Sequence, residues 1–383
     1  MFVRNLTEKE LYNLQRNYNK NSAQYQEIEE NYDGEKNLRE TETEKTVSRF
    51  TQKKKAALYL SLIEKGLKKH EKAERLEICG TSLVFEQGES AGSRLVFGNF
   101  CRVRLCPMCQ WRRSAKLQSQ MFAITEKLSA DYAFIFLTLT VPNCTAENLR
   151  DTLAAMQTAW NRFRQLKQIR KASKGYYRGI EVTHDIDKTI SAERYKRMRS
   201  YYDDRGIRQG DNNPNYGTYH PHYHIVIAVN KSYFTSRDYL PQKIWRELWE
   251  QSYRASGKLQ VDIKAVRPRK AGDEAARSAV LEVTKYPVKD SEYLSGDLTE
   301  DTRTVDALER ELSNLRFVSL GGCFKAAHAE LNFSDYDDPA AERGKDLDPM
   351  KLVAYIWKTG VSAFEPSAPY VRHYLAYEAE RRK

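Results

Sequence analysis

Residues 219–229 read YHPHYHIVIAV and place histidines at every second position directly before a β-branched apolar run. This pattern predicts a β-strand, in which successive side chains point to opposite faces. His222 and His224 should therefore project from one face, close enough to bind one divalent metal ion, and imidazole is the commonest metal ligand. The alternative is a polar cluster at a strand end that binds no metal.

The remaining periodicity predicts an α+β fold. An amphipathic helix is expected at residues 149–163, and a second helix should follow Pro241. Further strand-like runs occupy residues 133–141, 179–183, 259–263 and 315–320. Strands interspersed with helices in this way favour a central, mainly antiparallel five-stranded sheet with flanking helices.

A second candidate metal site lies in the N-terminal third of the chain. Two apolar runs, at residues 82–85 and 94–97, flank a turn-rich segment and predict a hairpin. Cys106 and Cys109 are separated by two residues in what should be a tight turn with Pro107, and the hairpin can bring Cys79 and Cys101 to complete four thiolates. The sequence therefore predicts a Cys-rich hairpin module with a structural zinc ion, in which Cys106 and Cys109 are stronger candidates than Cys79.

The charge balance favours a polyanionic partner. The chain has 63 Lys and Arg against 52 Asp and Glu, a net charge of +11. Nucleic acid is the first candidate, although a positive excess can also serve solubility alone. Four arginines would surround the zinc site with charge suited to phosphates: Arg102, Arg104, Arg112 and Arg113.

We expect a cytoplasmic protein without membrane association. No apolar run approaches the length of a membrane span, and the N-terminus lacks an apolar signal region. In a reducing compartment the six cysteines are poor candidates for disulfides and better candidates for metal ligands.

Composition divides the chain into four segments. Residues 1–53 are charged and amide-rich and should form a flexible arm. Residues 54–130 hold a helix, expected at about 54–77, and the Cys-rich zinc and DNA-binding module. Residues 131–325 form the sheet domain with a polar insertion at 184–219, and residues 326–383 form an acidic loop and a C-terminal segment.

Two further motifs complete the candidate chemistry. Glu181 is the natural third metal ligand, and the alternative is an exposed acid at a strand edge. Residues 281–290 read LEVTKYPVKD, in which Glu282 and Tyr286 share a helical face and Pro287 favours a helix end at the tyrosine. A tyrosine near a metal is a competent nucleophile toward phosphodiesters, with Lys285 or Lys289 assisting electrostatically.

Taken together and in order, these pieces carry a resemblance that covers roughly residues 75–331. The segments are RLCPMCQWRR at 104–113, FLTLTV at 136–141, EVT at 181–183, HYH at 222–224, EVTKYPVKD at 282–290 and LGG at 320–322. The series resembles the rolling-circle plasmid replication initiator (Rep) proteins of Gram-positive bacteria, members of the His-hydrophobic-His endonuclease superfamily.

The resemblance implies the fold of that superfamily for residues 131–325, and a role for each motif. His222 and His224, with Glu181 as third ligand, would bind a divalent ion, magnesium or manganese. Tyr286 would be the nicking nucleophile, and Glu282 would activate water in the terminating cleavage. His220 matches no ligand in this scheme.

The expected function is that of a plasmid replication initiator. It would nick one strand of the double-strand origin, supercoiled or extruded as a cruciform, and remain covalently attached to the 5′ end. The free 3′-hydroxyl would serve host polymerase, with a host helicase as a further partner and a homodimer compatible with the scheme. The alternatives are a relaxase or single-tyrosine transposase on the same scaffold, or a non-catalytic zinc-containing DNA-binding regulator.

Overall fold

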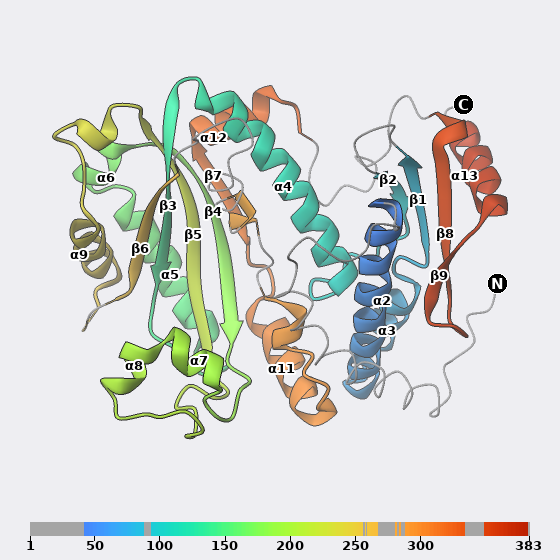
Figure 1. Cartoon of the computed structure of the whole chain (residues 1–383), viewed down its shortest axis with the longest axis horizontal. Coiled ribbons are helices and arrows are strands. Elements are labelled where there is room, and N and C mark those ends of the chain that lie inside the picture. Colours follow the sequence, from blue (N-terminus) through green and yellow to red (C-terminus); the bar gives the residue numbers. More distant parts are fainter. Residues whose placement is uncertain are drawn as a thin grey trace. The chain divides into compact units, whose positions relative to one another are not determined.

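The computed structural model (Figure 1) describes residues 42–87, 93–255, 257, 259–266, 280–281, 283–284, 288–333 and 348–381. The chain divides into two compact units. We call Leu117–Tyr293 with Ala307–Phe333 the His unit, and Met1–Lys116 with Leu294–Asp306 and Ser334–Lys383 the Cys unit. Among the described residues, no helix has both the length and the apolar character that a membrane span requires.

The His unit is built on a five-stranded sheet of order β6-β3-β5-β4-β7, and every neighbouring pair is antiparallel. The strands are β3 (Tyr132–Thr140), β4 (Ser173–His184), β5 (Tyr219–Asn230), β6 (Val261–Val266) and β7 (Val318–Gly322). The predicted α+β class is confirmed. All five predicted runs are strands, with bounds shifted by a few residues.

Helices α5 (Leu149–Phe163) and α9 (Gln242–Tyr253) pack against one face of this sheet. Trp160 of α5 lies edge-on to Tyr223 of β5, and the Trp249 indole of α9 donates to the Thr140 carbonyl at 2.9 Å. The predicted apolar stripe of α5 is buried along its whole length. The short helix α6 (Lys167–Ala172) joins α5 to β4, and the 3-10 turn η1 (Tyr233–Thr235) follows β5.

The opposite face is apolar at one end only. There Met121 and Ile124 of α4 (Pro107–Ser129) and Phe324 of α12 (Cys323–Glu330) form a buried cluster with Phe134 and Phe136 of β3. Farther along β3, the residues on this face are Thr138 and Thr140. The same face therefore changes from apolar to polar at Phe136.

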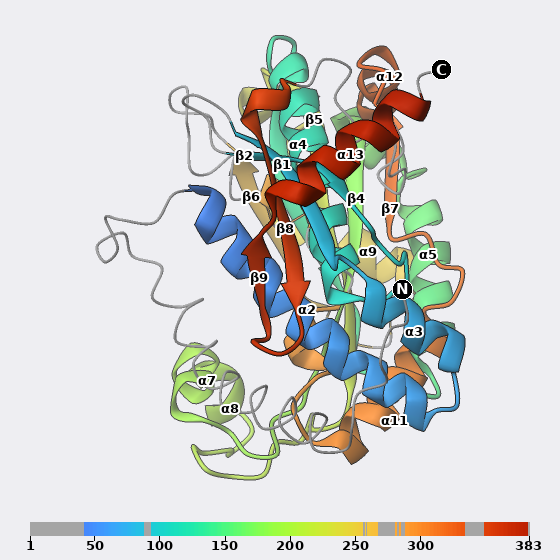
Figure 2. The same ribbon diagram turned by 90° about the vertical axis from the view of Figure 1, so that its right-hand side faces the viewer.

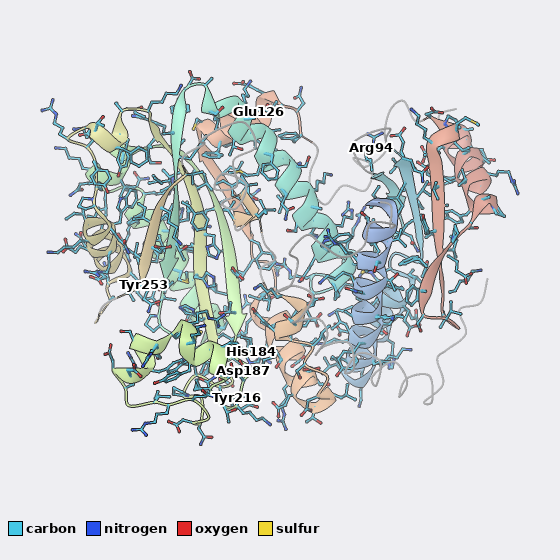
Figure 3. All side chains as sticks on the ribbon, viewed as in Figure 1. Arg94, Glu126, His184, Asp187, Tyr216 and Tyr253 are labelled. Atoms are coloured by element: carbon cyan, nitrogen blue, oxygen red, sulfur yellow. The ribbon has the colours of Figure 1, made fainter. Side chains whose placement is uncertain are left out.

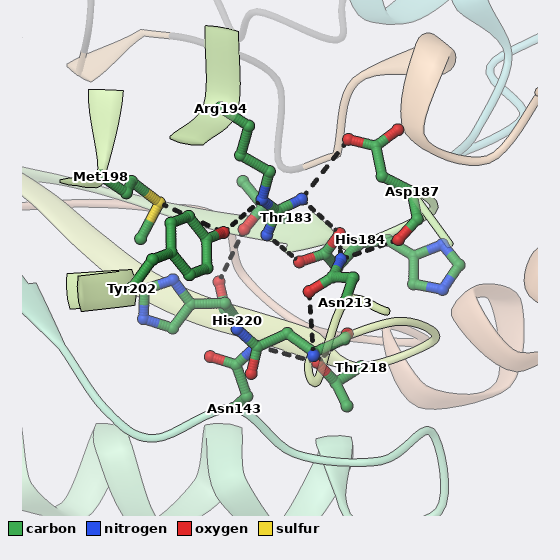
Figure 4. A network of polar contacts seen from close by, with 12 residues as sticks. Asn143, Thr183, His184, Asp187, Arg194, Met198, Tyr202, Asn213, Thr218 and His220 are labelled. Carbon is green, nitrogen blue, oxygen red and sulfur yellow. Dashed lines mark hydrogen bonds and ion pairs between the residues drawn. The ribbon is translucent and has the colours of Figure 1, made fainter. Parts of the chain in front are cut away.

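The insertion at 184–219 is an ordered lobe at the ends of β4 and β5. It contains two short helices, α7 (Ala192–Arg197) and α8 (Arg199–Asp203), which are separated at Met198. The Arg194 guanidinium donates to both carboxylate oxygens of Asp185, and Asn213 donates to Asp185 at 2.7 Å (Figure 4). This partly buried ion pair ties the lobe to the end of β4.

The Cys unit contains a second antiparallel sheet, of order β2-β1-β8-β9 (Figure 2). Its strands are β1 (Ser82–Gln87), β2 (Ser93–Gly98), β8 (Leu352–Lys358) and β9 (Ala363–Pro366). The predicted hairpin is β1-β2. The C-terminal segment was not expected to join it, yet β8 pairs with β1 and Tyr374 of α13 (Ala368–Arg381) packs on Val84. The predicted acidic loop lies outside the described residues apart from Asp348.

The N-terminal helices differ from the prediction. Helix α2 spans Glu42–Gly66 and α3 spans His70–Ile78, so the expected single helix at 54–77 is two helices. Lys68 in the intervening turn has a left-handed φ of 61°, which a continuous helix does not allow. Residues 42–53, expected in the flexible arm, are helical because Val47 and Phe50 are buried. The remaining elements are η2 (Asp290–Glu292), α11 (Leu298–Glu311) and η4 (Pro349–Lys351).

Candidate functional site

The three predicted ligands converge through strand register. Glu181 of β4 lies directly opposite His222 of β5, and Gly179 lies opposite His224. Residues opposite each other in antiparallel strands share a face of the sheet, so Glu181, His222 and His224 project together. Strand β4 pairs with β5 along its whole length, and with β7 on its other side at residues 175–179. The 4% exposure of Glu181 excludes the alternative of an exposed strand-edge acid.

The donor atoms lie close enough to share one ion. Glu181 Oε2 is 3.2 Å from His222 Nε2 and 2.8 Å from His224 Nε2. Metal bonds of about 2.0–2.2 Å place neighbouring ligand atoms about 3 Å apart, which matches these distances. All three side chains are buried, and all three donor atoms lie within 4.8 Å of one another. We call these residues the triad.

The surroundings orient the imidazoles for ligation. The His222 Nδ1–H donates to the His220 carbonyl at 3.0 Å, and His224 Nδ1 lies 3.2 Å from Thr138 Oγ1. With Nδ1 protonated, the Nε2 lone pair of His222 faces a carboxylate oxygen, an unfavourable arrangement unless a cation or proton lies between them. Burial raises the pKa of Glu181, but hydrogen bonds and charge from His222 and His224 bring it well below its usual range. The triad therefore fits a divalent cation.

The structure adds two residues that the sequence did not single out. The carboxylate of Glu292 accepts from the His184 backbone N–H at 3.2 Å, and the His184 ring is 3.0 Å from the Glu292 carbonyl. The rings of His184 and Tyr219 stack with their centroids 4.4 Å apart. Figure 3 shows His184 at the end of β4. Burial, together with the charge of Glu181, raises the pKa of Glu292 to about 7. No pattern identifies Glu292, since an acid after Pro287 is typical of a solvated loop.

Glu282, Lys285 and Tyr286 lie outside the described residues, but residues on both sides of them contact β4. On one side, a Cβ atom at Gly179 would lie 2.5 Å from the Val283 carbonyl oxygen, so Val283 packs directly on the strand. On the other side, Val288 is buried and Glu292 bonds His184. The two contact points on β4, residues 179 and 184, bracket Glu181. Lys289 is half-buried, and its charge lowers the pKa of Glu292.

The four predicted zinc ligands form one buried cluster. Cys109 Sγ lies 3.7 Å from both Cys79 Sγ and Cys101 Sγ, and Cys106 Sγ lies 3.6 Å from Cys79 Sγ. Zn–S bonds of about 2.3 Å place the sulfurs of a tetrahedral site about 3.8 Å apart, in agreement with these distances. None of the four is in a disulfide. The donor set fits a structural zinc ion.

Two details of this cluster differ from expectation. Pro107 begins α4, so Cys109 lies in the first turn of a helix and not in a tight turn. The Lys54 side chain is fully buried beside the cluster, where its ammonium donates to the carbonyls of Glu77 and Cys79 at 2.6 and 2.7 Å. Burial lowers the pKa of Lys54 to about 8, and the charges of Cys79, Cys106 and Cys101 act in the opposite direction. Lys54 therefore supplies a positive charge next to the thiolates.

The four arginines of this module differ in accessibility. Arg102 is exposed, and Arg104 and Arg113 are half-buried. Arg113 donates to the Arg102 carbonyl at 3.3 Å. Arg112 is only 5% exposed, and its guanidinium lies 5.0 Å from the centre of the Phe100 ring. Arg112 thus packs within the module and, in this position, does not present its charge to a phosphate.

The cysteine cluster generates a prediction about metal content. Cys106→Ser or Cys109→Ser should lower bound zinc and the temperature of unfolding, because metal binding and folding are coupled at structural sites. Elemental analysis of the purified protein and thermal unfolding followed by circular dichroism measure both. Cys144→Ser, outside the cluster, is the matched control. Unchanged zinc content in both cluster variants would contradict the assignment.

Lys54 generates a second prediction. Lys54→Met should weaken zinc binding by about 10- to 100-fold, the usual effect of losing a partner of the metal ligands. Competition with a chromophoric chelator measures the affinity. Lys55→Met on the same helix removes an equal charge that is only half-buried, and it should leave zinc affinity unchanged. Equal affinities for all three proteins would show that Lys54 serves packing alone.

Comparison with known proteins gives one consistent result. The family model described as Rep_1, replication protein, matches residues 92–360. A "Protein rep" of Bacillus amyloliquefaciens is 31% identical over 76% of this chain and 84% of that protein. A "Protein rep" of Bacillus sp is 32% identical over 70% and 83% of the two chains, and one of Staphylococcus aureus is 29% identical over 65% and 95%. No solved structure matches this chain.

The match begins between Cys79 and Cys101, so it contains three of the four clustered cysteines. It extends through the triad, the tyrosine segment and β8, and therefore covers parts of both units. The relatives are named "Protein rep" or "Replication protein" and come from Gram-positive bacteria. The chain therefore belongs to the Rep_1 replication protein family, the plasmid replication initiators of Gram-positive bacteria.

Proposed function

We propose that this initiator starts rolling-circle replication by nicking one strand of its plasmid origin through Tyr286, assisted by a divalent metal ion, magnesium or manganese, at Glu181, His222 and His224. The observation that carries the proposal is the triad itself, three buried donor atoms within 4.8 Å of one another on adjacent strands. The scaffold is that of the His-hydrophobic-His endonucleases.

The position of the tyrosine segment supports the same site. Residue 286 is three residues from Val283, which packs on Gly179, and six from Glu292, which bonds His184. Three residues of extended chain span at most about 10 Å. The Tyr286 side chain thus has the reach to bring its hydroxyl to a phosphate held at the triad.

The nicking step follows from these groups. The Tyr286 hydroxyl gives its proton to solvent as its oxygen attacks phosphorus, the bond from phosphorus to the 3′ oxygen breaks, and that oxygen takes a proton from solvent to leave as a 3′-hydroxyl. The 5′-phosphate remains esterified to Tyr286. When bound, the divalent cation neutralises phosphate charge and stabilises the pentavalent transition state. Glu181, His222 and His224 hold the site rigidly because β4 and β5 pair with each other at these residues, and β5 also pairs with β3 on its other side. In this proposal Lys285 and Lys289 add positive charge beside the tyrosine.

Termination requires a second cleavage with only one nucleophilic tyrosine. In this proposal Glu282, four residues before Tyr286 in the sequence, directs water or closes the cycle by joining, which releases circular single-stranded DNA. Cleavage at a replication origin distinguishes this function from that of a relaxase or transposase, and the similarity to replication proteins favours it. A non-catalytic regulator would leave the buried triad without a role.

The triad makes a separate prediction. His224→Ala should abolish metal-dependent nicking of the supercoiled plasmid and leave origin binding largely intact, because phosphate and base contacts come chiefly from other surfaces. Agarose gels that separate supercoiled from nicked plasmid give the first quantity, and filter binding gives the second. His328→Ala, on α12, is a control with the same chemical change. Normal nicking by both His222→Ala and His224→Ala would rule out the metal assignment.

Tyr286 and Glu282 should separate into two roles. Tyr286→Phe retains the ring and removes the attacking oxygen, so it should bind origin DNA and form no covalent adduct. Glu282→Ala should form the adduct and release it slowly, because water activation is needed only at the later step. Denaturing gels of 5′-trapped oligonucleotides resolve both. An adduct with Tyr286→Phe would assign the nucleophile to another tyrosine, although the nearest in sequence, Tyr293, is only 1% exposed. Normal turnover by Glu282→Ala would contradict its role.

A further inference from the structure

The His unit carries a strongly basic surface that the triad chemistry does not use. Residues 152–180 contain seven Lys and Arg and no Asp or Glu, a net charge of +7 in a chain whose total is +11. Arg178 is buried, and the other six are exposed at the end of α5, along α6 and at the start of β4. We call these six the α6 patch: Arg162, Arg164, Lys167, Arg170, Lys171 and Lys174.

The charges of the α6 patch are mostly not neutralised by carboxylates. Among the described residues, only Lys171 has an ion pair, with Asp238 at 2.6 Å. Arg162 and Arg164 contact neutral oxygens of Ser252 and Asn161. Beneath the patch, burial lowers the pKa of Arg178, and the charge of Arg164 lowers it further. The region therefore has a positive potential that attracts a polyanion.

The patch lies far from the triad within the same unit. Helix α6 ends where β4 begins, at Ser173, and Glu181 is eight residues farther along that strand. At about 3.3 Å per residue this is about 26 Å, and Figure 1 shows α6 and the insertion helices α7 and α8 at opposite ends of β4. A phosphate held at the triad cannot touch the α6 patch. A polyanion that touches both must extend about 26 Å, the length of about eight base pairs of duplex.

We propose that the α6 patch binds the phosphate backbone of double-stranded DNA that flanks the nicked site, an inference that rests on the proposed function of the triad. Duplex DNA has the higher charge density of the two nucleic acid forms, one charge per about 1.7 Å of axis. The segment from residue 162 to 174 offers no exposed aromatic ring, because its single aromatic residue, Phe163, is buried. Single-strand binding surfaces normally use such rings to stack bases.

The binding experiment uses the full-length protein, a 40-base-pair duplex of random sequence and a 40-nucleotide single strand, measured by fluorescence anisotropy across salt concentrations. The triple variant Arg164→Ala, Lys167→Ala, Arg170→Ala should weaken duplex binding by about tenfold or more at 0.15 M salt. It should also reduce the slope of log affinity against log salt by about 2 to 3, since each lost phosphate contact removes about 0.9.

The matched control is Lys127→Ala, Lys243→Ala, Arg303→Ala. It removes the same net charge, but each of these side chains has a carboxylate partner: Glu330, Glu247 and Glu300. This variant should keep most of the duplex affinity and slope. A second variant, Arg164→Lys, Lys167→Arg, Arg170→Lys, preserves the patch charge and should bind as the original protein does, which tests folding and charge separately.

Each outcome decides the inference. Equal losses in the patch and control variants would mean a general charge effect and overturn it. Loss of single-strand binding with intact duplex binding would show that the patch binds single-stranded DNA, and would overturn the inference. No loss of binding to either DNA would also overturn it and would favour an acidic protein surface as the partner of the patch. Cleavage of a single-stranded oligonucleotide that covers the mapped nick should be unchanged in the patch variant. If the original protein fails to cleave it, the proposed function fails and the duplex-binding result stands independently.

Discussion

The antiparallel register between β4 and β5 is the constraint on which the site depends. It places Glu181 directly opposite His222 and Gly179 opposite His224. A shift of one residue would turn the carboxylate to the other face, toward α5 and α9. The long pairing, from residue 173 to residue 184, makes such a shift costly, since every apolar side chain of β4 would leave its packing partners. The chemistry of three polar side chains is thus held in place by the apolar packing of two strands.

Side chains on both faces of this sheet contribute to the position of the triad. On one face Tyr223, between the two histidines, packs against Trp160 and Trp249, and this packing fixes the orientation of the strand. On the other face the apolar cluster ends at Phe136, whose ring stacks on His224 at 5.5 Å. The triad therefore lies where a dry, packed interior meets the polar end of the sheet, which keeps its ligand atoms desolvated and ordered.

The two clusters that fit metal ions would meet the cost of buried charge in different ways. The triad offers one carboxylate and two imidazole nitrogens, so a bound divalent cation would leave it with a net positive charge suited to a phosphate. Four thiolates around zinc carry a net negative charge, and the buried ammonium of Lys54 offsets part of it. Lys54 comes from α2, so the cluster also ties the N-terminal helix to the hairpin. The first cluster is suited to catalysis and the second to holding the fold together.

The sequence by itself determined the local features, because they depend on spacing along the chain: the His-x-His strand, the α5 stripe, the β1-β2 hairpin, and the pair Cys106 and Cys109. It left open whether Glu181 is a ligand or an exposed acid, and it ranked Cys79 below Cys106 and Cys109. Only the tertiary structure decided what depends on distant contacts. It placed Glu181 on an interior strand, paired β8 with β1, and made α2 extend into the supposed arm through Val47 and Phe50. It also brought Lys54 to the thiolates and Glu292 to His184, since neither residue has a periodic signal and each owes its environment to a partner remote in sequence.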